Sequence, residues 1–347
     1  MIRFSVPFYF LIFLISDFIV YGQDETPGYD TAYIQSYRDY LVLTLVGVLN
    51  SNTVSIADNT DKEITFSTNL PFYFGFSVDY KWLTFEFTKN INTSPDELKG
   101  ETNSHSLGFG ITGRKFWFRT FWKDYEGYYM ENPDYDNPDF DEEVDPFPLR
   151  PDLHTAIFFA NLNYGFNYRR YSNTASLWQL EKQKKSAGSF TIGLSAGHTE
   201  MQADSALVLS KWELNFNHNA LITNYQFNWI GLNGGYLHTF SMFKRKRFFV
   251  SLALIPGVSF QFGKAHIENS TELLKKIGIG AQTETRLVLG YNSQKWYTSL
   301  SVNSYAISNA FVQDNSIVHG YNFLRIVYGR KFRIRETKSE FLKKIGL

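Results

Sequence analysis

Hydrophobic and polar residues alternate along much of the chain, most regularly between Arg247 and Phe262. Every even position of this stretch is apolar, whereas the odd positions mix small, apolar and polar residues such as Ser251 and Gln261. Side chains of a strand alternate between its two faces. The stretch is therefore predicted to be a long strand whose two faces meet different environments, and a transmembrane β-barrel requires many such strands in a closed array.

The same alternation recurs through the chain. In Lys81–Lys89, Leu83, Phe85 and Phe87 share one face, opposite Thr84, Glu86 and Thr88. Twelve stretches are predicted to be strands: 38–50, 63–80, 81–89, 104–112, 115–125, 155–168, 189–198, 225–240, 247–262, 280–291, 295–306 and 320–332. Two further stretches, 171–180 and 205–217, are weaker candidates. Only an even number of strands returns the chain to its starting side of the membrane, so either both are strands or neither is. The sequence therefore predicts 12 or 14 strands.

Short and long connections alternate between the predicted strands. The short ones are 79–80, 113–114, 242–246 and 292–294, and the long ones are 51–62, 91–103, 127–153, 264–279 and 308–319. Outer-membrane barrels have short periplasmic turns and longer extracellular loops. The predicted fold class is therefore all-β, a single transmembrane antiparallel β-barrel located in the outer membrane.

Composition supports this class and excludes others. Aromatic residues make up 18% of the chain, as expected for aromatic girdles, and the formal net charge is zero. A nucleic-acid-binding protein would carry a basic excess. The absence of cysteine excludes disulfides, thiolate metal sites, a catalytic thiol and a lipoprotein anchor.

The two ends of the chain differ from the barrel region. Residues 1–22 combine Arg3, an apolar run and small residues before Gln23, which predicts an export signal peptide. The alternative is a membrane anchor, although Asp17 would interrupt it. A periplasmic lead-in at 23–37, a barrel at 38–332 and a basic periplasmic tail at 333–347 complete the predicted organisation. Expected partners are the barrel-insertion machinery, outer-membrane lipid and lipopolysaccharide.

A sequence signature occupies the middle of the chain. It comprises Phe166-Asn167-Tyr168, Arg170-Tyr171-Ser172 and the run Gln183, Lys184, Lys185, Ser186, Ala187, Gly188, Ser189 and Phe190. With Tyr29-Asp30-Thr31 near the start and Gly234-Gly235-Tyr236 later, the chain resembles an uncharacterised family of outer-membrane barrels from Bacteroidota, known as a domain of unknown function. The resemblance implies the fold and the location, and it carries no activity.

Lys184 and Lys185 stand beside small polar residues. Together with Ser186 and Ser189 they could contact lipopolysaccharide phosphates or dock a plug segment in the lumen. They could equally form a polar turn before a strand.

Charged residues fall on the predicted inner face. They are Glu86, Arg119, Glu284, Arg286 and Arg325. Glu284 and Arg286 are two positions apart, hence on one face and close enough to pair. The set is either a salt-bridge network that fills a narrow barrel, because buried charges need partners, or a lumen site for a polar or anionic solute.

Ser195 lies in a Gly-x-Ser-x-Gly sequence, with His198 beside it. This motif activates serine when it forms a strand-to-helix elbow with a separate base. Here the motif lies inside a predicted strand with alternating residues. Small residues on the inner face of a barrel would produce the same Gly-x-Ser-x-Gly pattern without any catalytic role. A barrel-embedded hydrolase would need a serine and a histidine brought together from different strands.

The segment 131–152 is the most acidic part of the chain. Its candidate calcium or magnesium ligands are Asp134, Asp136, Asp139 and Asp141. The glycine turn and terminal glutamate of a defined calcium loop are lacking, and a solvated external loop explains the same residues. No cofactor is predicted.

Three functions are consistent with the sequence. The first is a narrow pore or ligand-specific uptake channel, which the charged inner face suggests. The second is a structural or surface-interaction barrel with an acidic outer loop, and the third is a barrel-embedded lipid hydrolase that uses Ser195.

Overall fold

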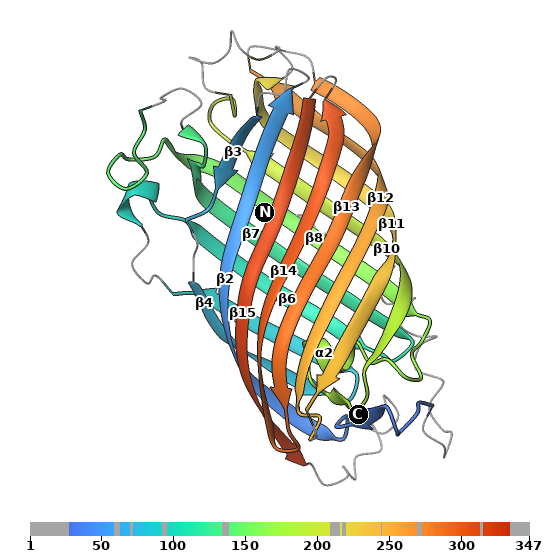
Figure 1. Cartoon of the computed structure of the whole chain (residues 1–347). Coiled ribbons are helices and arrows are strands. Elements are labelled where there is room, and N and C mark those ends of the chain that lie inside the picture. Colours follow the sequence, from blue (N-terminus) through green and yellow to red (C-terminus); the bar gives the residue numbers. More distant parts are fainter. Residues whose placement is uncertain are drawn as a thin grey trace, which may run out of the picture.

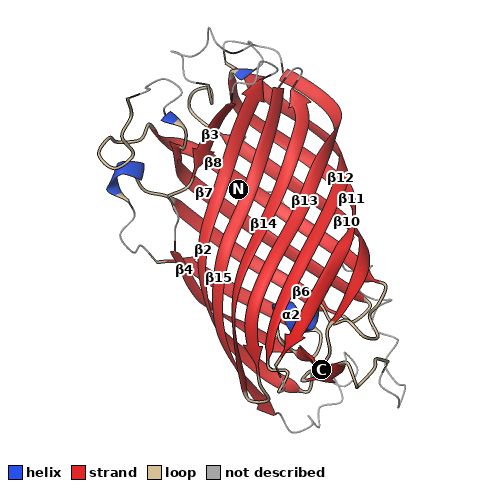
Figure 2. Ribbon diagram, in the orientation of Figure 1, coloured by secondary structure: helices blue, strands red, loops and turns tan. Residues whose placement is uncertain are grey.

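The structure is a computed structural model that describes residues 28–58, 63–69, 72–91, 96–133, 139–208, 216, 220–243, 245–268, 273–312 and 315–333. One antiparallel sheet of 13 strands curls round until β15 (Asn315–Arg333) pairs with β2 (Tyr40–Asp58). This pairing closes the sheet into the tilted barrel of Figure 1 and Figure 2. The predicted all-β antiparallel barrel is therefore confirmed.

The other strands of the barrel follow the order of the chain. They are β3 (Glu63–Ser67), β4 (Phe72–Tyr80), β5 (Leu83–Asn90), β6 (Asn103–Thr112), β7 (Phe116–Met130), β8 (Leu149–Gly165), β10 (Ala187–Gln202), β11 (Ile222–Met242), β12 (Phe248–Ile267), β13 (Leu273–Asn292) and β14 (Trp296–Val312). Outside the barrel sheet lie β1 (Ile34–Ser36), β9 (Glu181–Gln183), the 3-10 helix η1 (Glu97–Lys99) and the short helix α2 (Thr174–Leu177).

Thirteen strands fill twelve positions round the barrel. Residues 53–57 of β2 pair with β3, and residues 42–49 pair with β4, so β3 and β4 are two parts of one interrupted strand. The weaker strand candidate at 171–180 is wrong, and most of the candidate at 205–217 lies outside the described residues. Residues 171–180 contain α2, and residues 205–208, part of the second candidate, form no strand in the described structure.

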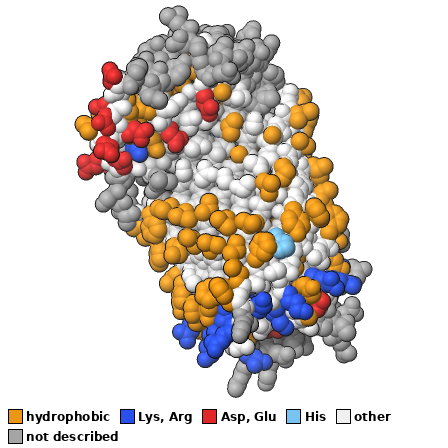
Figure 3. All heavy atoms as spheres, viewed as in Figure 1, with side chains coloured by type: hydrophobic (Ala, Val, Ile, Leu, Met, Phe, Trp, Pro, Cys, Tyr) orange, Lys and Arg blue, Asp and Glu red, His pale blue; other side chains and the backbone are white. Residues whose placement is uncertain are grey.

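The outer face of the barrel is apolar, as β12 illustrates. Leu254 and Phe260 point outward and are 57% and 52% exposed, whereas Ser251 and Gln261 point inward and are at most 1% exposed. Figure 3 shows the resulting band of hydrophobic side chains. From Phe248 to Phe262 the strand rises about 46 Å, or about 35 Å along a barrel axis tilted by about 40°. The band therefore matches a bilayer core of about 30 Å with its flanking girdles.

The strands extend further at the long-loop end than the sequence predicts. β12 continues to Ile267 and β13 begins at Leu273, so the expected loop at 264–279 is mostly strand. Beyond Phe262 the outward positions carry Lys264 and His266, and the apolar signal ends although strand pairing continues. The barrel wall therefore projects beyond the apolar band.

The interior differs between the two halves of the barrel. In the long-loop half, inward aromatic residues such as Phe159, Trp229 and Tyr305 pack into one apolar cluster. Leu207 and Val208, from the connection between β10 and β11, are buried in the same cluster. The sequence predicted a polar inner face, and this half is filled by apolar side chains instead. Among the described residues, no helix is long and apolar enough to cross a membrane.

Candidate functional site: a chamber inside the barrel

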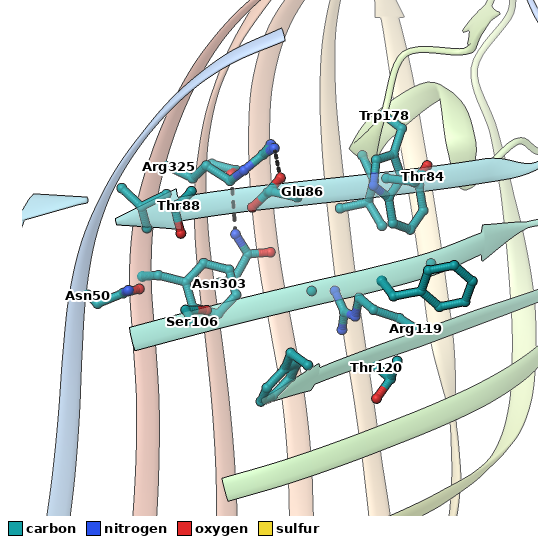
Figure 4. A pocket seen from close by; sticks show the side chains of 18 of the residues that line it. Asn50, Thr84, Glu86, Thr88, Ser106, Arg119, Thr120, Trp178, Asn303 and Arg325 are labelled. Atoms are coloured by element: carbon teal, nitrogen blue, oxygen red, sulfur yellow. Dashed lines mark hydrogen bonds and ion pairs between the residues drawn. The ribbon is translucent and has the colours of Figure 1, made fainter. Parts of the chain in front are cut away.

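A cavity of about 140 Å³ lies in the lumen, in the half nearer the short turns. Its walls come from strands that are far apart in sequence, including Glu86 on β5, Arg119 on β7 and Arg325 on β15 (Figure 4). Leu177 of α2 and the following Trp178 line the side nearest the short turns. Phe121 and Phe323 line it as well and pack against the aromatic cluster of the other half. The chamber is thus bounded by packed side chains toward both ends of the barrel.

All five predicted lumen charges lie inside the barrel. Arg325 Nη2 is 2.6 Å from Glu86 Oε2, and Arg119 Nη2 is 3.2 Å from Glu284 Oε1. The Tyr305 hydroxyl also donates to Glu284 Oε1, at 2.8 Å. Arg286 does not pair with Glu284 as its spacing suggested, since its Nη2 donates to Asn173 Oδ1 at 2.8 Å. Asn173 lies in the connection between β8 and β10, so Arg286 contacts a segment rather than the wall.

Lys123 is a charged chamber residue that was not among the five predicted lumen charges. Its side chain is inward on β7, only 7% of the residue is exposed, and it lines the cavity. The ammonium lies 4.8 Å from the ring centre of Phe323 and 5.5 Å from that of Phe121. Among the described residues it forms no ion pair with a carboxylate. The sequence did contain a signal for its inward position: Lys123 lies four residues after Arg119 and two before Tyr125, and residues an even number of positions apart share one face of a strand.

The connection between β8 and β10, residues 166–186, folds back into the short-turn end of the lumen. We call it the plug; Figure 1 shows its helix α2 within the barrel. Its buried Glu181 accepts hydrogen bonds from Arg38 Nε at 2.7 Å and from Ser172 Oγ at 2.6 Å. Arg114 Nε lies 2.9 Å from Glu181 Oε1 as an ion pair, without the alignment of a hydrogen bond. Burial alone would raise the pKa of Glu181, but the two guanidinium groups outweigh it and lower the pKa.

Residues 28–37 form a strap across the plug. β1 pairs with β9, Ile34 lying opposite Gln183. The Asp30 amide donates to the Arg169 carbonyl at 2.8 Å, and Lys184 Nζ donates to the Thr31 carbonyl at 2.8 Å. The start of the described chain is therefore fastened to the plug.

The signature residues hold these pieces together. Gln183 Oε1 accepts from the Ser172 amide at 3.0 Å, and Gln183 Nε2 donates to the carbonyls of Arg170 and Lys185. Ser189 Oγ accepts from the Asn167 amide at 2.9 Å, Asn167 Nδ2 donates to the Gly188 carbonyl, and Ser186 Oγ accepts from the Ser241 amide. Lys184 and Lys185 lie in the bend between β9 and β10, which fits a polar turn before a strand, while Gln183, Ser186 and Ser189 make contacts that dock the plug.

Ser195 and His198 lie on opposite faces of β10. Ser195 is inward and shares hydrogen bonds with Gln282. His198 is outward, with Nδ1 3.0 Å from Asn228 Oδ1. The strand passes through Gly193–Gly197 without an elbow, so these two residues do not form a nucleophile and base.

The candidate metal ligands do not form a site in the described part of the chain. Asp134 and Asp136 lie outside the described residues, and Asp139 and Asp141 are exposed in the long connection after β7. The described residues contain no group of three side chains that could hold a metal ion.

A family model described as domain of unknown function (DUF4421) matches residues 28–332. The chain belongs to this family. The match runs from the strap through the plug to the last barrel strand, so strap, plug and wall are parts of one DUF4421 unit. A search of curated proteins gave no match.

Solved structures similar to this DUF4421 chain are outer-membrane barrels. Outer membrane protease OmpT from Escherichia coli has 8% identity and a TM-score of 0.37, covering 86% of this chain and 98% of that one. The toluene transporter TodX from P. putida has 7% identity and a TM-score of 0.28, with 86% and 91% covered. The translocator domain of autotransporter NalP from Neisseria meningitidis has 9% identity and a TM-score of 0.30, with 94% of both chains covered. At such low values nothing about activity follows.

Proposed function

We propose that the protein spans the outer membrane of a Gram-negative bacterium of the Bacteroidota, with its short-turn end in the periplasm. The apolar band supports a membrane location, and the alternation of short and long connections supports the orientation. An export signal in residues 1–22 would deliver the chain to this membrane.

We further propose that the lumen binds a small anionic solute and releases it across the membrane when the plug moves. The function is a ligand-specific uptake barrel rather than a permanently open pore. The observation that carries the proposal is Lys123, a buried cation that lines the chamber and has no carboxylate partner in the described part of the chain.

The charges of the chamber favour an anion. Arg325 pairs with Glu86 and Arg119 with Glu284, and among the described residues no carboxylate lies within ion-pair distance of the Lys123 ammonium. An unpaired charge in a low-dielectric interior is costly, and an anion from solution would supply the missing partner. The cavity, about 140 Å³, is roughly ten times the smallest space that holds a water molecule, so a small carboxylate or phosphate has room.

Side chains block the lumen on both sides of the chamber, so transport would require one of the two sides to open. The plug closes the short-turn side, and the aromatic cluster fills the long-loop side. Besides the apolar contacts of Tyr171, Trp178 and Leu180 with the wall, the plug is held by hydrogen bonds and ion pairs, which can be exchanged for water. The aromatic cluster of the other half is larger and apolar. Plug movement is therefore the more accessible of the two openings.

Anion binding can be measured on the refolded full chain by fluorescence of Trp178, which lines the chamber. Inorganic phosphate, acetate and succinate are titrated in turn, and Trp178→Phe gives the background from the other tryptophans. At least one anion should change the emission, and Lys123→Met should weaken its binding at least tenfold. Lys115→Met, on the exposed turn before β7, is the matched control. Equal binding by Lys123→Met, or no response to any of these anions, would refute the proposal.

Planar-bilayer recording tests the gate separately. The wild-type barrel should remain closed for most of the time, and its brief openings should prefer anions over cations. Openings that prefer cations would contradict the proposed role of Lys123.

A surface-interaction barrel is the second candidate. The observation that favours it is the tightly packed apolar half, which includes Phe121 stacked on Phe159 with ring centres 4.9 Å apart. Such a barrel would bind no anion and show no openings in either assay.

A further inference from the structure

Basic residues surround the short-turn end of the barrel. Each connection there carries at least one: Lys81 between β4 and β5, Lys115 between β6 and β7, Arg169 between β8 and β10, Lys246 between β11 and β12, and Lys295 between β13 and β14. Arg330 is exposed near the end of β15, the strand that pairs with β2 and closes the barrel. We call these six residues the basic ring.

Few acidic groups offset the ring. In the described part of this end, the carboxylates that are not buried are Asp30 and Asp39. Glu181 is buried and already neutralised by Arg38 and Arg114. Figure 3 shows the contrast on one face, with Lys and Arg directly beyond the hydrophobic band and Asp and Glu near the opposite end.

The ring adjoins aromatic residues at the short-turn end, some of which face outward. Lys115 Nζ lies 5.0 Å from the ring centre of Tyr168, and the Arg330 guanidinium lies 5.7 Å from that of Phe332. Trp296 and Phe332 are 38% and 42% exposed on the outer face. Long cationic side chains beside interfacial aromatic residues place their charges at the level of the lipid headgroups.

We propose that the basic ring binds the headgroups of anionic phospholipids in the leaflet at the short-turn end. The circular distribution supports a lipid partner, because a protein partner would contact one sector, whereas a leaflet surrounds the barrel. The acidic long-loop end, with exposed Glu97, Glu101, Glu142 and Glu143, would not attract the same lipids. This inference is independent of the anion chamber.

Trp296 reports directly on the ring, since it pairs with Arg330 across the β14–β15 ladder and follows Lys295 in sequence. Trp122, 40% exposed on β7 and toward the long-loop end, reports on the other side of the band. The full chain is reconstituted in vesicles of equal parts phosphatidylcholine and phosphatidylglycerol, with bromine on the acyl chains of one or the other. Bromine quenches adjacent tryptophans, and Trp296→Phe and Trp122→Phe separate the two signals.

Brominated phosphatidylglycerol should quench Trp296 more than brominated phosphatidylcholine does, with a relative affinity of about fivefold for each nearby cation. Trp122 should show no such preference. Arg330→Gln and Lys295→Gln should each reduce the preference at Trp296 about fivefold, whereas Arg330→Lys should retain it. High salt should also abolish it.

Equal quenching of Trp296 by the two lipids would overturn the proposal. In that case, salt-sensitive retention of the folded barrel on immobilised poly-glutamate, lost in Arg169→Gln, would assign the ring to an acidic protein partner. A preference that survives Arg330→Gln combined with Lys295→Gln would also overturn it. The anion titration at Trp178 is unaffected by either result.

Discussion

Replacing Glu181 with alanine should loosen the plug while leaving the barrel wall intact. Glu181 is fully buried, and its carboxylate is the common partner of Arg38, Arg114 and Ser172. The substitution leaves two guanidinium groups at the short-turn end of the lumen without their counter-charge. None of these contacts belongs to the β-ladder of the barrel.

The expected magnitude follows from the burial of the three groups. Removing one partner of a buried ion pair costs about 3–5 kcal/mol, because it leaves an uncompensated charge. The Arg38 and Arg114 side chains are 15% and 27% exposed, so both can regain some water. We therefore expect the lower limit, about 3 kcal/mol, which makes local opening of the plug about 100-fold more frequent.

Amide hydrogen exchange with peptide-level mass spectrometry measures this opening. The Tyr37 amide donates to the Leu180 carbonyl at 2.8 Å, and the Lys184 amide donates to the Tyr33 carbonyl at 2.6 Å. Exchange at such amides reports the free energy of local opening. Peptides from the strap and plug should exchange about 100-fold faster in Glu181→Ala, while peptides from β12 exchange at the wild-type rate. Glu143→Ala, at an exposed site in the long connection after β7, is the control.

Unchanged protection of the plug in a folded Glu181→Ala barrel would refute the reasoning, since the ion pairs would then contribute little to docking. Equal loss of protection in β12 would refute it in a different way. That result would mean that the plug and the wall open as one cooperative unit.

Two further predictions concern pH and packing. Because the folded-state pKa of Glu181 is lowered, its carboxylate stabilises the docked plug at pH above its unfolded value, and this stabilisation is lost as the pH falls through the folded value. Plug exchange should therefore accelerate in acid in the wild type, and a Glu181→Gln variant should lack this dependence. In β11, Gly235→Ala should lower the urea midpoint of unfolding, at a cost of about 1–3 kcal/mol, because the new Cβ meets the backbone of Leu254 and Ile255. At Gly234→Ala the nearest atom, the Thr191 carbonyl oxygen, is 3.5 Å away, and a midpoint lowered equally by both variants would contradict this explanation.

The barrel wall could be predicted because its signal is local. Alternation in Phe248–Phe262 reflects lipid on one side of the strand, and each strand of the wall carries some form of it. The alternation of apolar and polar residues is lost where the strands extend beyond the apolar band. Lys264 and His266 continue the strand with polar outward residues, so the sequence placed a loop there.

The contents of the lumen could not be predicted because they depend on contacts between distant residues. Arg119 and Glu284 were both assigned to the inner face, but only the closed barrel shows that they pair with each other. The plug was harder still, since α2 has four residues and no helical periodicity to detect. Glu181 received no role because its partners Arg38 and Arg114 lie far away in sequence.

The plug is continuous with two neighbouring strands of the wall. It leaves β8 after Gly165 and enters β10 at Ala187, and Gly165 is paired with Thr191 across that ladder. A segment held at both ends stays near its docking site at an effective concentration on the order of millimolar. Redocking is therefore a unimolecular step whose rate does not depend on protein concentration. The proposed opening is therefore reversible within one molecule, because a displaced plug remains attached at both ends and can dock again without a second chain.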